Sequence, residues 1–298
     1  MKRALVKKVK GALDERGYTY AEYDGGCFDI AARGEKTMTI KVLTNIDSFL
    51  PFQASSLKRV SAHLQSEPLI VGVRTNKGTL DDGVMFERFS IPAFTASTFE
   101  DVIDGEYPEF RRLKGGLFGE IDGDALRSAR LKRNLTQEEL GSKLSVSKKT
   151  IYQHERGVGL ANADLIRKAE IILEERITRS VTIRYDLDGM HGTPKNNIEG
   201  EVAQGLRKLG FSTFFVEKAP FDIIAEGREP VFSEVISEKK DTKKNVEALR
   251  EISALFERKF FLVSEDDVGD APVITKDELS SFESSAELIK SLQKKRII

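Results

Sequence analysis

The chain has 298 residues, which is enough for two or three domains of ordinary size. Charged residues make up 32% of it, against roughly 25% in an average soluble protein, yet basic and acidic residues balance to a net charge of -1. A single Cys excludes an internal disulfide and a Cys-based zinc site, and a charged partner must be met by a local patch.

The N-terminal segment MKRALVKKVKGALDERGY is basic and amphipathic, and it lacks the apolar region and cleavage site of a secretory signal. No apolar run approaches the ~20 residues that span a bilayer. A hydrophobic content of 40% is sufficient for packed cores. We therefore expect a cytoplasmic protein of several domains, with no membrane partner.

An internal repeat relates the two ends of the chain. The string FDIAARG at Phe28–Gly34 recurs as FDIIAEG at Phe221–Gly227, and eight of 31 aligned positions around it are identical. Each copy predicts a helix, a strand–turn–strand, a second helix, a buried strand and a short strand leading to a capped helix. This shared order favours duplicated α/β repeats, at residues 1–104 and 198–298, over chance similarity.

A different segment separates the repeats. Residues 105–123 are rich in Gly and charge and predict a linker that could hold a short hairpin. Residues 124–178 predict an all-helical domain, and residues 179–197 a strand followed by a Gly/Pro/Asn hinge. The expected fold class is thus multi-domain, with an all-α domain of five helices between two duplicated α/β domains.

The central domain carries a helix-turn-helix pattern. Thr136 and Glu139 form a capping box at the start of one helix, and Ser147 caps the next after a tight turn at Ser145. Two helices joined by so short a turn cross each other, which leaves the start of the second free to enter a DNA major groove. The apolar residues spaced to form the core are Leu140, Leu144, Val146 and Ile151.

This stretch resembles the Cro-like helix-turn-helix of phage repressors over about a sixth of the chain. The shared pattern is Leu-Thr-Gln-x-x-Leu at 135–140, Val-Ser-x-x-Thr-Ile at 146–151 and Glu-x-Gly at 155–157. The sequence departs from it at Gly141, where Ala is usual, and at Ser145, where Gly is usual. Gly141 should weaken its helix by up to ~1 kcal/mol, and Ser145 must accept an uncommon backbone conformation.

The resemblance implies a role for each matching residue. Arg130 and Glu155 correspond to an ion pair between helices, and Leu140, Val146 and Ile151 are structural. Residues 124–160 hold eight Lys/Arg and four Asp/Glu, a local net charge of +4 that suits a nucleic-acid partner. The implied DNA-binding residues are Gln137, Ser147, Lys148, Lys149, Thr150, Tyr152, Gln153 and Arg156.

The flanking repeats resemble the restriction-endonuclease and Holliday-junction-resolvase fold. That resemblance implies an Asp…Glu-x-Lys site, in which two carboxylates hold Mg²⁺ and the Lys polarises the attacking water. The C-terminal copy has Asp222 and Glu234, but Ile236 replaces the Lys, for which Lys239 or Lys240 could substitute.

In the N-terminal copy, Asp29 is kept, Lys41 replaces the Glu and Leu43 replaces the Lys. A positive charge at a metal-ligand position and an apolar residue at the catalytic position both argue against cleavage. A simpler interpretation is that Asp29 and Asp222 cap turns. We therefore expect degenerate nuclease-like domains with no catalytic residue, no metal and no cofactor.

The whole layout is similar to a family of archaeal helix-turn-helix transcriptional regulators. We expect a sequence-specific regulator rather than an enzyme, acting as a homodimer on double-stranded DNA and reading the major groove with residues 147–156. Two alternatives stay open. One is a Mg²⁺-dependent nuclease that uses the C-terminal repeat, and the other is a protein-interaction adaptor that no longer binds DNA.

Overall fold

The computed structural model describes the whole chain except residues 186, 188–190, 237–241, 267 and 296–298. Lys239 and Lys240, considered above as substitutes for a catalytic Lys, lie outside the described residues. The chain forms two compact units. The first combines residues 1–70 with residues 185–298, and the second consists of residues 71–184.

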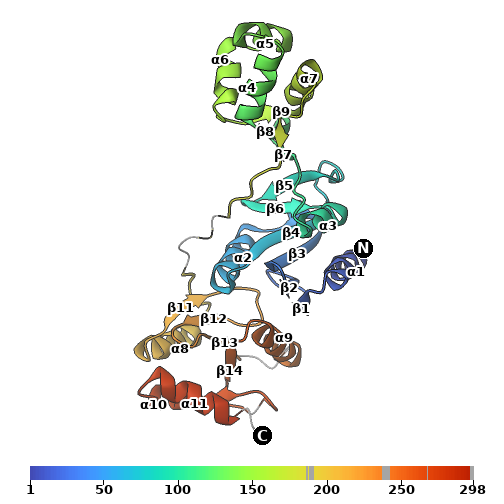
Figure 1. The fold of residues 1–298 in the computed structure, drawn as a ribbon. Coiled ribbons are helices and arrows are strands. Elements are labelled where there is room, and N and C mark those ends of the chain that lie inside the picture. The colour runs from blue at the N-terminus through green and yellow to red at the C-terminus, as the bar shows by residue number, and fades with distance from the viewer. Residues whose placement is uncertain (186, 188–190, 237–241, 267, 296–298) are drawn as a thin grey trace. The chain divides into compact units, whose positions relative to one another are not determined.

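The N-terminal part of the first unit is an α/β repeat in the predicted order (Figure 1). Its three leading strands are antiparallel neighbours, and α1 turns its Leu and Val side chains inward at helical spacing. Its elements are α1 (Lys2–Glu15), β1 (Thr19–Glu22), β2 (Ile30–Arg33), β3 (Thr37–Asn45), the 3-10 helix η1 (Ile46–Ser48), α2 (Pro51–Leu64) and β4 (Glu67–Arg74), whose second half belongs to the other unit.

The C-terminal part repeats this order. Its sheet runs β11-β12-β13-β14-β15, and β13 pairs in parallel with β14, which requires the crossover that α9 provides. The elements are α8 (Asn197–Lys208), β11 (Ser212–Phe215), β12 (Ile223–Glu226), β13 (Val231–Val235), α9 (Thr242–Leu255), β14 (Lys259–Val263), β15 (Val273–Ile274), α10 (Lys276–Ser281) and α11 (Ser285–Lys295).

The two repeats correspond at a constant offset of 193 residues through their first three strands. The β1–β2 and β11–β12 ladders have the same register, and so do β2–β3 and β12–β13. The shared Gly34 and Gly227 each lie against an aromatic ring. A Cβ atom at Gly34 would be 2.6 Å from the Tyr18 ring, and one at Gly227 would be 2.9 Å from the Phe211 ring. The recurring glycines therefore mark a close approach that a larger residue would block.

Within the first unit the two repeats contact each other directly, and α9 packs against β1. The Cys27 N–H donates to the Lys218 carbonyl at 2.5 Å. An ion pair joins Arg33 to Glu257 at 2.7 Å. Residues from opposite ends of the chain thus form one body.

The second unit contains the helix-turn-helix together with a sheet in the order β4-β6-β5-β7-β8-β10, with β9 also paired to β8. In Figure 1, α4, α5 and α6 are drawn in green, with α7 beside them. The elements are β5 (Val84–Arg88), β6 (Ile91–Phe94), α3 (Ala96–Ile103), β7 (Phe110–Leu113), β8 (Gly116–Ile121), α4 (Gly123–Lys132), α5 (Gln137–Leu144), α6 (Lys148–Glu155), β9 (Ala161–Asn162), α7 (Ala163–Leu173) and β10 (Thr178–Arg179).

Within the predicted linker 105–123, the short hairpin that the sequence allowed is β7–β8, and its residues Phe110 and Ile121 pack into the core of the helical domain. Two expectations for this unit need correction. Residues 124–178, all of which are described, hold the four helices α4 to α7 and not five, and the two-residue strand β9 pairs with β8. The strand expected from Ser180 lies earlier, at β10, where it pairs with the end of β8.

Candidate nucleic-acid interface and nuclease-like sites

The turn between α5 and α6 is built as the sequence predicts. The Glu139 N–H donates to Thr136 Oγ1 at 3.1 Å, and the Thr136 N–H donates back to the Glu139 carboxylate at 2.7 Å. Ser147 accepts from the Thr150 N–H at 3.1 Å and so caps α6. Ser145 takes the left-handed conformation at φ +58°. These caps satisfy N–H groups that would otherwise lack partners at each helix start.

Gly141 lies at the closest approach of α5 to this turn. A Cβ atom there would be 2.8 Å from the Val146 carbonyl oxygen and 3.3 Å from the Lys148 nitrogen. The sequence indicates only the helix-weakening effect of this glycine. The structure adds a steric reason for it, because the turn backbone occupies the space that a methyl group would need.

A buried ion pair between Arg130 and Glu155 joins α4 to the inner face of α6. The Arg130 Nε–H donates to Glu155 Oε1 at 2.5 Å, and Arg130 also donates to the Leu135 carbonyl at 2.7 Å. Only 9% of the Arg130 side chain and 6% of the Glu155 side chain are exposed. Gln137, one of the DNA-binding residues that the resemblance implies, donates one amide N–H to Glu155 Oε2 at 2.7 Å. Its carboxamide has a second N–H, so a role in DNA binding stays a prediction.

The outer face of α6 brings together most of the predicted DNA-binding side chains, and these are exposed: Ser147, Lys148, Lys149, Tyr152, Gln153 and Arg156. The Arg156 guanidinium lies 5.6 Å from the centre of the Tyr152 ring and donates to its hydroxyl at 3.2 Å. Thr150 is half-buried, and its hydroxyl lies 2.9 Å from that of Ser147. The Thr150 hydroxyl therefore belongs to the capping arrangement as well as to the predicted interface.

His154 is a buried residue of α6 that the sequence reasoning missed. Its spacing of three residues from Ile151 places both on the inner face of the helix, and that spacing could have identified it. Within the described part of the chain, His154 Nδ1 has no hydrogen-bond partner. Burial lowers the pKa of this imidazole below its ordinary value, which favours the neutral ring.

In the N-terminal repeat, the Asp29 carboxylate is buried between two ammonium groups. Lys2 Nζ donates to Asp29 Oδ1 at 2.7 Å, and Lys41 Nζ lies 3.2 Å from Oδ2. The Val42 N–H also donates to Oδ2, at 2.7 Å. Burial opposes the charge on Lys2, but hydrogen bonds to Asp24 and Asp29 outweigh it and raise the pKa of the Lys2 ammonium.

The C-terminal repeat has the same arrangement around Asp222. Lys195 Nζ donates to Asp222 Oδ1, and the Val235 N–H donates to Oδ2 at 2.9 Å. Burial opposes the ammonium form of Lys195, but the charge of Asp222 outweighs it and raises the Lys195 pKa. Glu234 accepts from the Asn245 amide at 3.2 Å. Neither Asp29 nor Asp222 is the exposed turn cap considered above, since each is a buried carboxylate paired with an ammonium group.

Glu199 adds a third carboxylate to the C-terminal cluster and was also missed by the sequence reasoning. Burial, followed by the charge of Asp222, raises the pKa of Glu199. The same two causes raise the pKa of Glu234 to about 8. The Oε2 atom of Glu234 is buried without a hydrogen-bond partner among the described residues. The offset of 193 pairs Lys195 with Lys2 but pairs Glu199 with Val6, so it could have identified the lysine and not this carboxylate.

Two family models match the N-terminal and central parts of the chain. A sequence model of the PD-(D/E)XK superfamily domain matches residues 2–108, and a helix-turn-helix model matches residues 126–178. A Pyrococcus furiosus protein named "Putative HTH-type transcriptional regulatory protein" is 33% identical over 99% of this chain and 98% of its own length. The chain belongs to this archaeal family. A relative in Thermococcus gammatolerans, named in the same way, is 32% identical over 97% of this chain and 95% of its own length. Another, in Methanocaldococcus jannaschii, is 31% identical over 90% of this chain and 88% of its own length. No solved structure matches the chain.

The resemblance to a helix-turn-helix regulator with a nuclease-like domain is thereby confirmed. The superfamily of residues 2–108 implies a divalent metal between carboxylates, and the residues of this family member do not fit one. In the N-terminal repeat Lys2 and Lys41 both contact Asp29, and position 6, which corresponds to Glu199, is Val6. In the C-terminal repeat the Lys195 ammonium contacts the carboxylate that would be a ligand.

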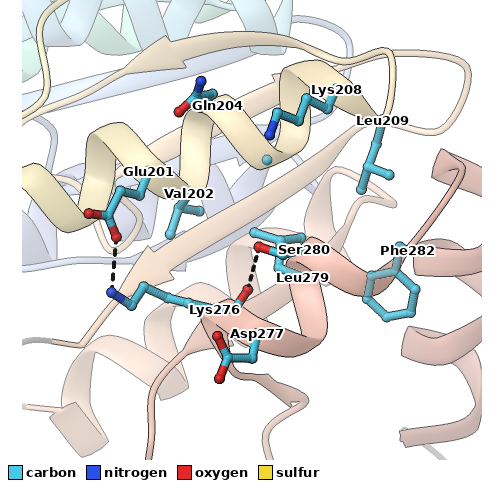
Figure 2. Close-up of a pocket in the computed structure, with 11 residues that line it drawn as sticks. Glu201, Val202, Gln204, Lys208, Leu209, Lys276, Asp277, Leu279, Ser280 and Phe282 are labelled. Carbon is cyan, nitrogen blue, oxygen red and sulfur yellow. Dashed lines mark hydrogen bonds and ion pairs between the residues drawn. The ribbon is translucent and has the colours of Figure 1, made fainter.

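A pocket of about 290 Å³ lies between α8 and α10 (Figure 2). Lys276 and Glu201 form an ion pair across it at 2.9 Å, and Leu279 packs near Gly205, where an added Cβ would be 3.2 Å from it. None of the predicted site residues lines this pocket. In the described part of the chain, no helix is both long and apolar enough to cross a membrane.

Proposed function

We propose that the protein is a sequence-specific DNA-binding transcriptional regulator that reads the major groove with residues 147–156. The observation that carries this proposal is the exposed polar and basic outer face of α6, fixed from below by the buried Arg130–Glu155 pair. Membership of a family named for helix-turn-helix regulation supports the same function. A rigid, capped helix with exposed cations is what groove binding requires.

Individual side chains then have distinct roles. Lys148 and Lys149 can donate to guanine O6 and N7 or to phosphate, and Gln153 can pair with adenine through its amide. Arg156, whose guanidinium lies 5.6 Å from the centre of the Tyr152 ring, would contact the phosphate backbone. Phosphate contacts would set the register of the helix, and the base contacts would select the sequence.

We further propose an internal duplication of the α/β repeats and a homodimeric regulator without enzymatic activity. The common ladder register and the two glycine–aromatic contacts support the duplication. Domain limits follow as residues 1–104, 124–178 and 198–298, joined by residues 105–123 and 179–197. A homodimer should occupy two half-sites whose centres are about 10 bp apart or a multiple of that.

The test is selection of bound duplexes from a random pool, followed by footprinting of wild type and variants. Lys149→Ala and Gln153→Ala should each weaken binding to the selected site by about 1–3 kcal/mol and relax the preference at one base position. Lys168→Ala, which removes an exposed cation from α7, is the matched control and should leave the preference unchanged. Identical footprints for all four proteins would exclude the proposed roles.

Two other outcomes identify the alternatives. A protein-interaction adaptor would show little dependence of duplex binding on salt, whereas real phosphate contacts produce a steep decrease of affinity with salt. A nuclease would nick duplex, branched or single-stranded DNA in Mg²⁺ and lose that activity in Asp222→Ala. The ammonium groups on Asp29 and Asp222 weigh against the nuclease.

A further inference from the structure

Both nuclease-like repeats contain a lysine that has no place in the Asp…Glu-x-Lys pattern. We propose that Lys2 and Lys195 are internal cations that take the place of a divalent metal against Asp29 and Asp222. They would make the α/β repeats independent of metal ions. This inference is separate from DNA binding, because none of these four residues lies in the helix-turn-helix.

The geometry is the same in both copies, residue for residue. Each lysine stands at the start of the first helix of its repeat and donates to Oδ1 of the buried aspartate. Oδ2 of that aspartate accepts a strand N–H, from Val42 at 2.7 Å and from Val235 at 2.9 Å. Two sites 193 residues apart thus share one arrangement of three residues, although only eight of 31 aligned positions are identical.

Charge explains why an ammonium group would be kept there. A buried carboxylate with no compensating charge is strongly unfavourable, and in metal-dependent enzymes the cation supplies that compensation. Here the ammonium donates to Oδ1 of the buried aspartate and supplies that compensating charge from within the chain. Lysine is suited to this role because its compact charge sits on a flexible stem that can reach inward from the surface.

The two copies differ in what remains if the lysine is removed. In the N-terminal repeat, Lys41 would still neutralise Asp29 at 3.2 Å. In the C-terminal repeat, Asp222 and Glu199 both contact the Lys195 ammonium, Glu199 at 3.8 Å, and both would lose it. With the lysine in place, no group of three or more acidic, His or Cys side chains among the described residues could hold a metal ion. Carboxylates that have lost a shared cation offer the oxygen ligands that Mn²⁺ and Mg²⁺ prefer.

The experiment therefore compares Lys195→Met with Lys2→Met in the full chain, using Mn²⁺ as the probe. Met keeps most of the length of the stem and removes the charge. Free Mn²⁺ is measured by its electron paramagnetic resonance signal, and melting temperature is measured with and without Mn²⁺. Asp222→Asn combined with Lys195→Met removes a ligand from the new site and sets the background.

We expect Lys195→Met to bind about one Mn²⁺ per chain, at least tenfold more tightly than wild type, and to melt at a higher temperature when Mn²⁺ is present. Wild type, Lys2→Met and the double variant should show neither effect. If Lys195→Met does not fold alone, Mn²⁺ or the added Asp222→Asn change should restore folding, because each removes the uncompensated charge.

Three results would overturn the proposal. One is a folded Lys195→Met that binds no more Mn²⁺ than wild type. Another is Asp222-dependent Mn²⁺ binding by wild type, which would mean that the lysine does not close the site. The third is an unfolded Lys195→Met that neither Mn²⁺ nor Asp222→Asn restores, which would assign Lys195 a packing role instead.

Discussion

Removal of Glu155 should destabilise the helix-turn-helix far more than removal of an exposed carboxylate. In Glu155→Ala, Arg130 loses two bonds, at 2.5 and 3.3 Å, and Gln137 loses its acceptor at 2.7 Å. Because only 9% of the Arg130 side chain is exposed, its guanidinium would stay buried beside one carbonyl group. A buried pair broken on one side costs about 3–5 kcal/mol. Glu175→Ala, which removes the exposed partner of Lys132, should change stability little, because solvent screens an exposed ion pair.

Hydrogen exchange measured on peptides from α4 to α6 reports the opening free energy of this region alone, which suits a chain of several domains. The difference in hydrogen exchange between Glu155→Ala and wild type gives the loss of opening free energy directly. Replacing both partners, as in Arg130→Met with Glu155→Leu, should recover most of the stability, since no charge is left buried. Equal effects of Glu155→Ala and Glu175→Ala would refute the reasoning.

Two further predictions concern the same domain. Gly141→Ala should destabilise this domain, because its Cβ would lie 2.8 Å from the Val146 carbonyl oxygen. That overlap costs roughly 1–3 kcal/mol, which outweighs the ~1 kcal/mol gained in helix propensity. Slower hydrogen exchange in α5 of the variant would contradict this. Burial lowers the folded-state pKa of His154 below 6.5, so the unfolded chain takes up this proton first and stability should fall as the pH drops below 6.5. Melting temperatures from pH 7.5 to 5 should therefore decrease less steeply in His154→Gln than in wild type, and parallel curves would exclude this role.

The helix-turn-helix could be placed from the sequence because its signals are local. Thr136 with Glu139, and Ser147 with Thr150, make bonds that span three residues, and the helices begin directly after these caps. The order of elements in each α/β repeat was equally accessible, because hydrophobic periodicity and turn residues recur in both copies. The pairing of β9 with β8 joins residues more than 40 positions apart, so no local pattern could predict it.

The contacts in the nuclease-like sites could not be predicted from the sequence, because they join residues far apart in the chain. Asp29 was identified as a site position, but its partner Lys2 lies 27 residues away, and Asp222 is equally distant from Lys195. No local pattern links a lysine near the start of a helix to an aspartate that precedes a strand. Only the offset of 193 residues, applied to every residue and not just to the repeated FDI string, would have matched Lys2 with Lys195.

The helix-turn-helix unit, residues 71–184, is inserted into a body formed by both ends of the chain. It is therefore tethered at its two ends, and a single cut after Arg184 would not release it. The two fragments would stay together through contacts between the repeats such as Arg33–Glu257. The unit that contains the helix-turn-helix therefore has two covalent connections to the rest of the chain, where a domain at a chain terminus has one.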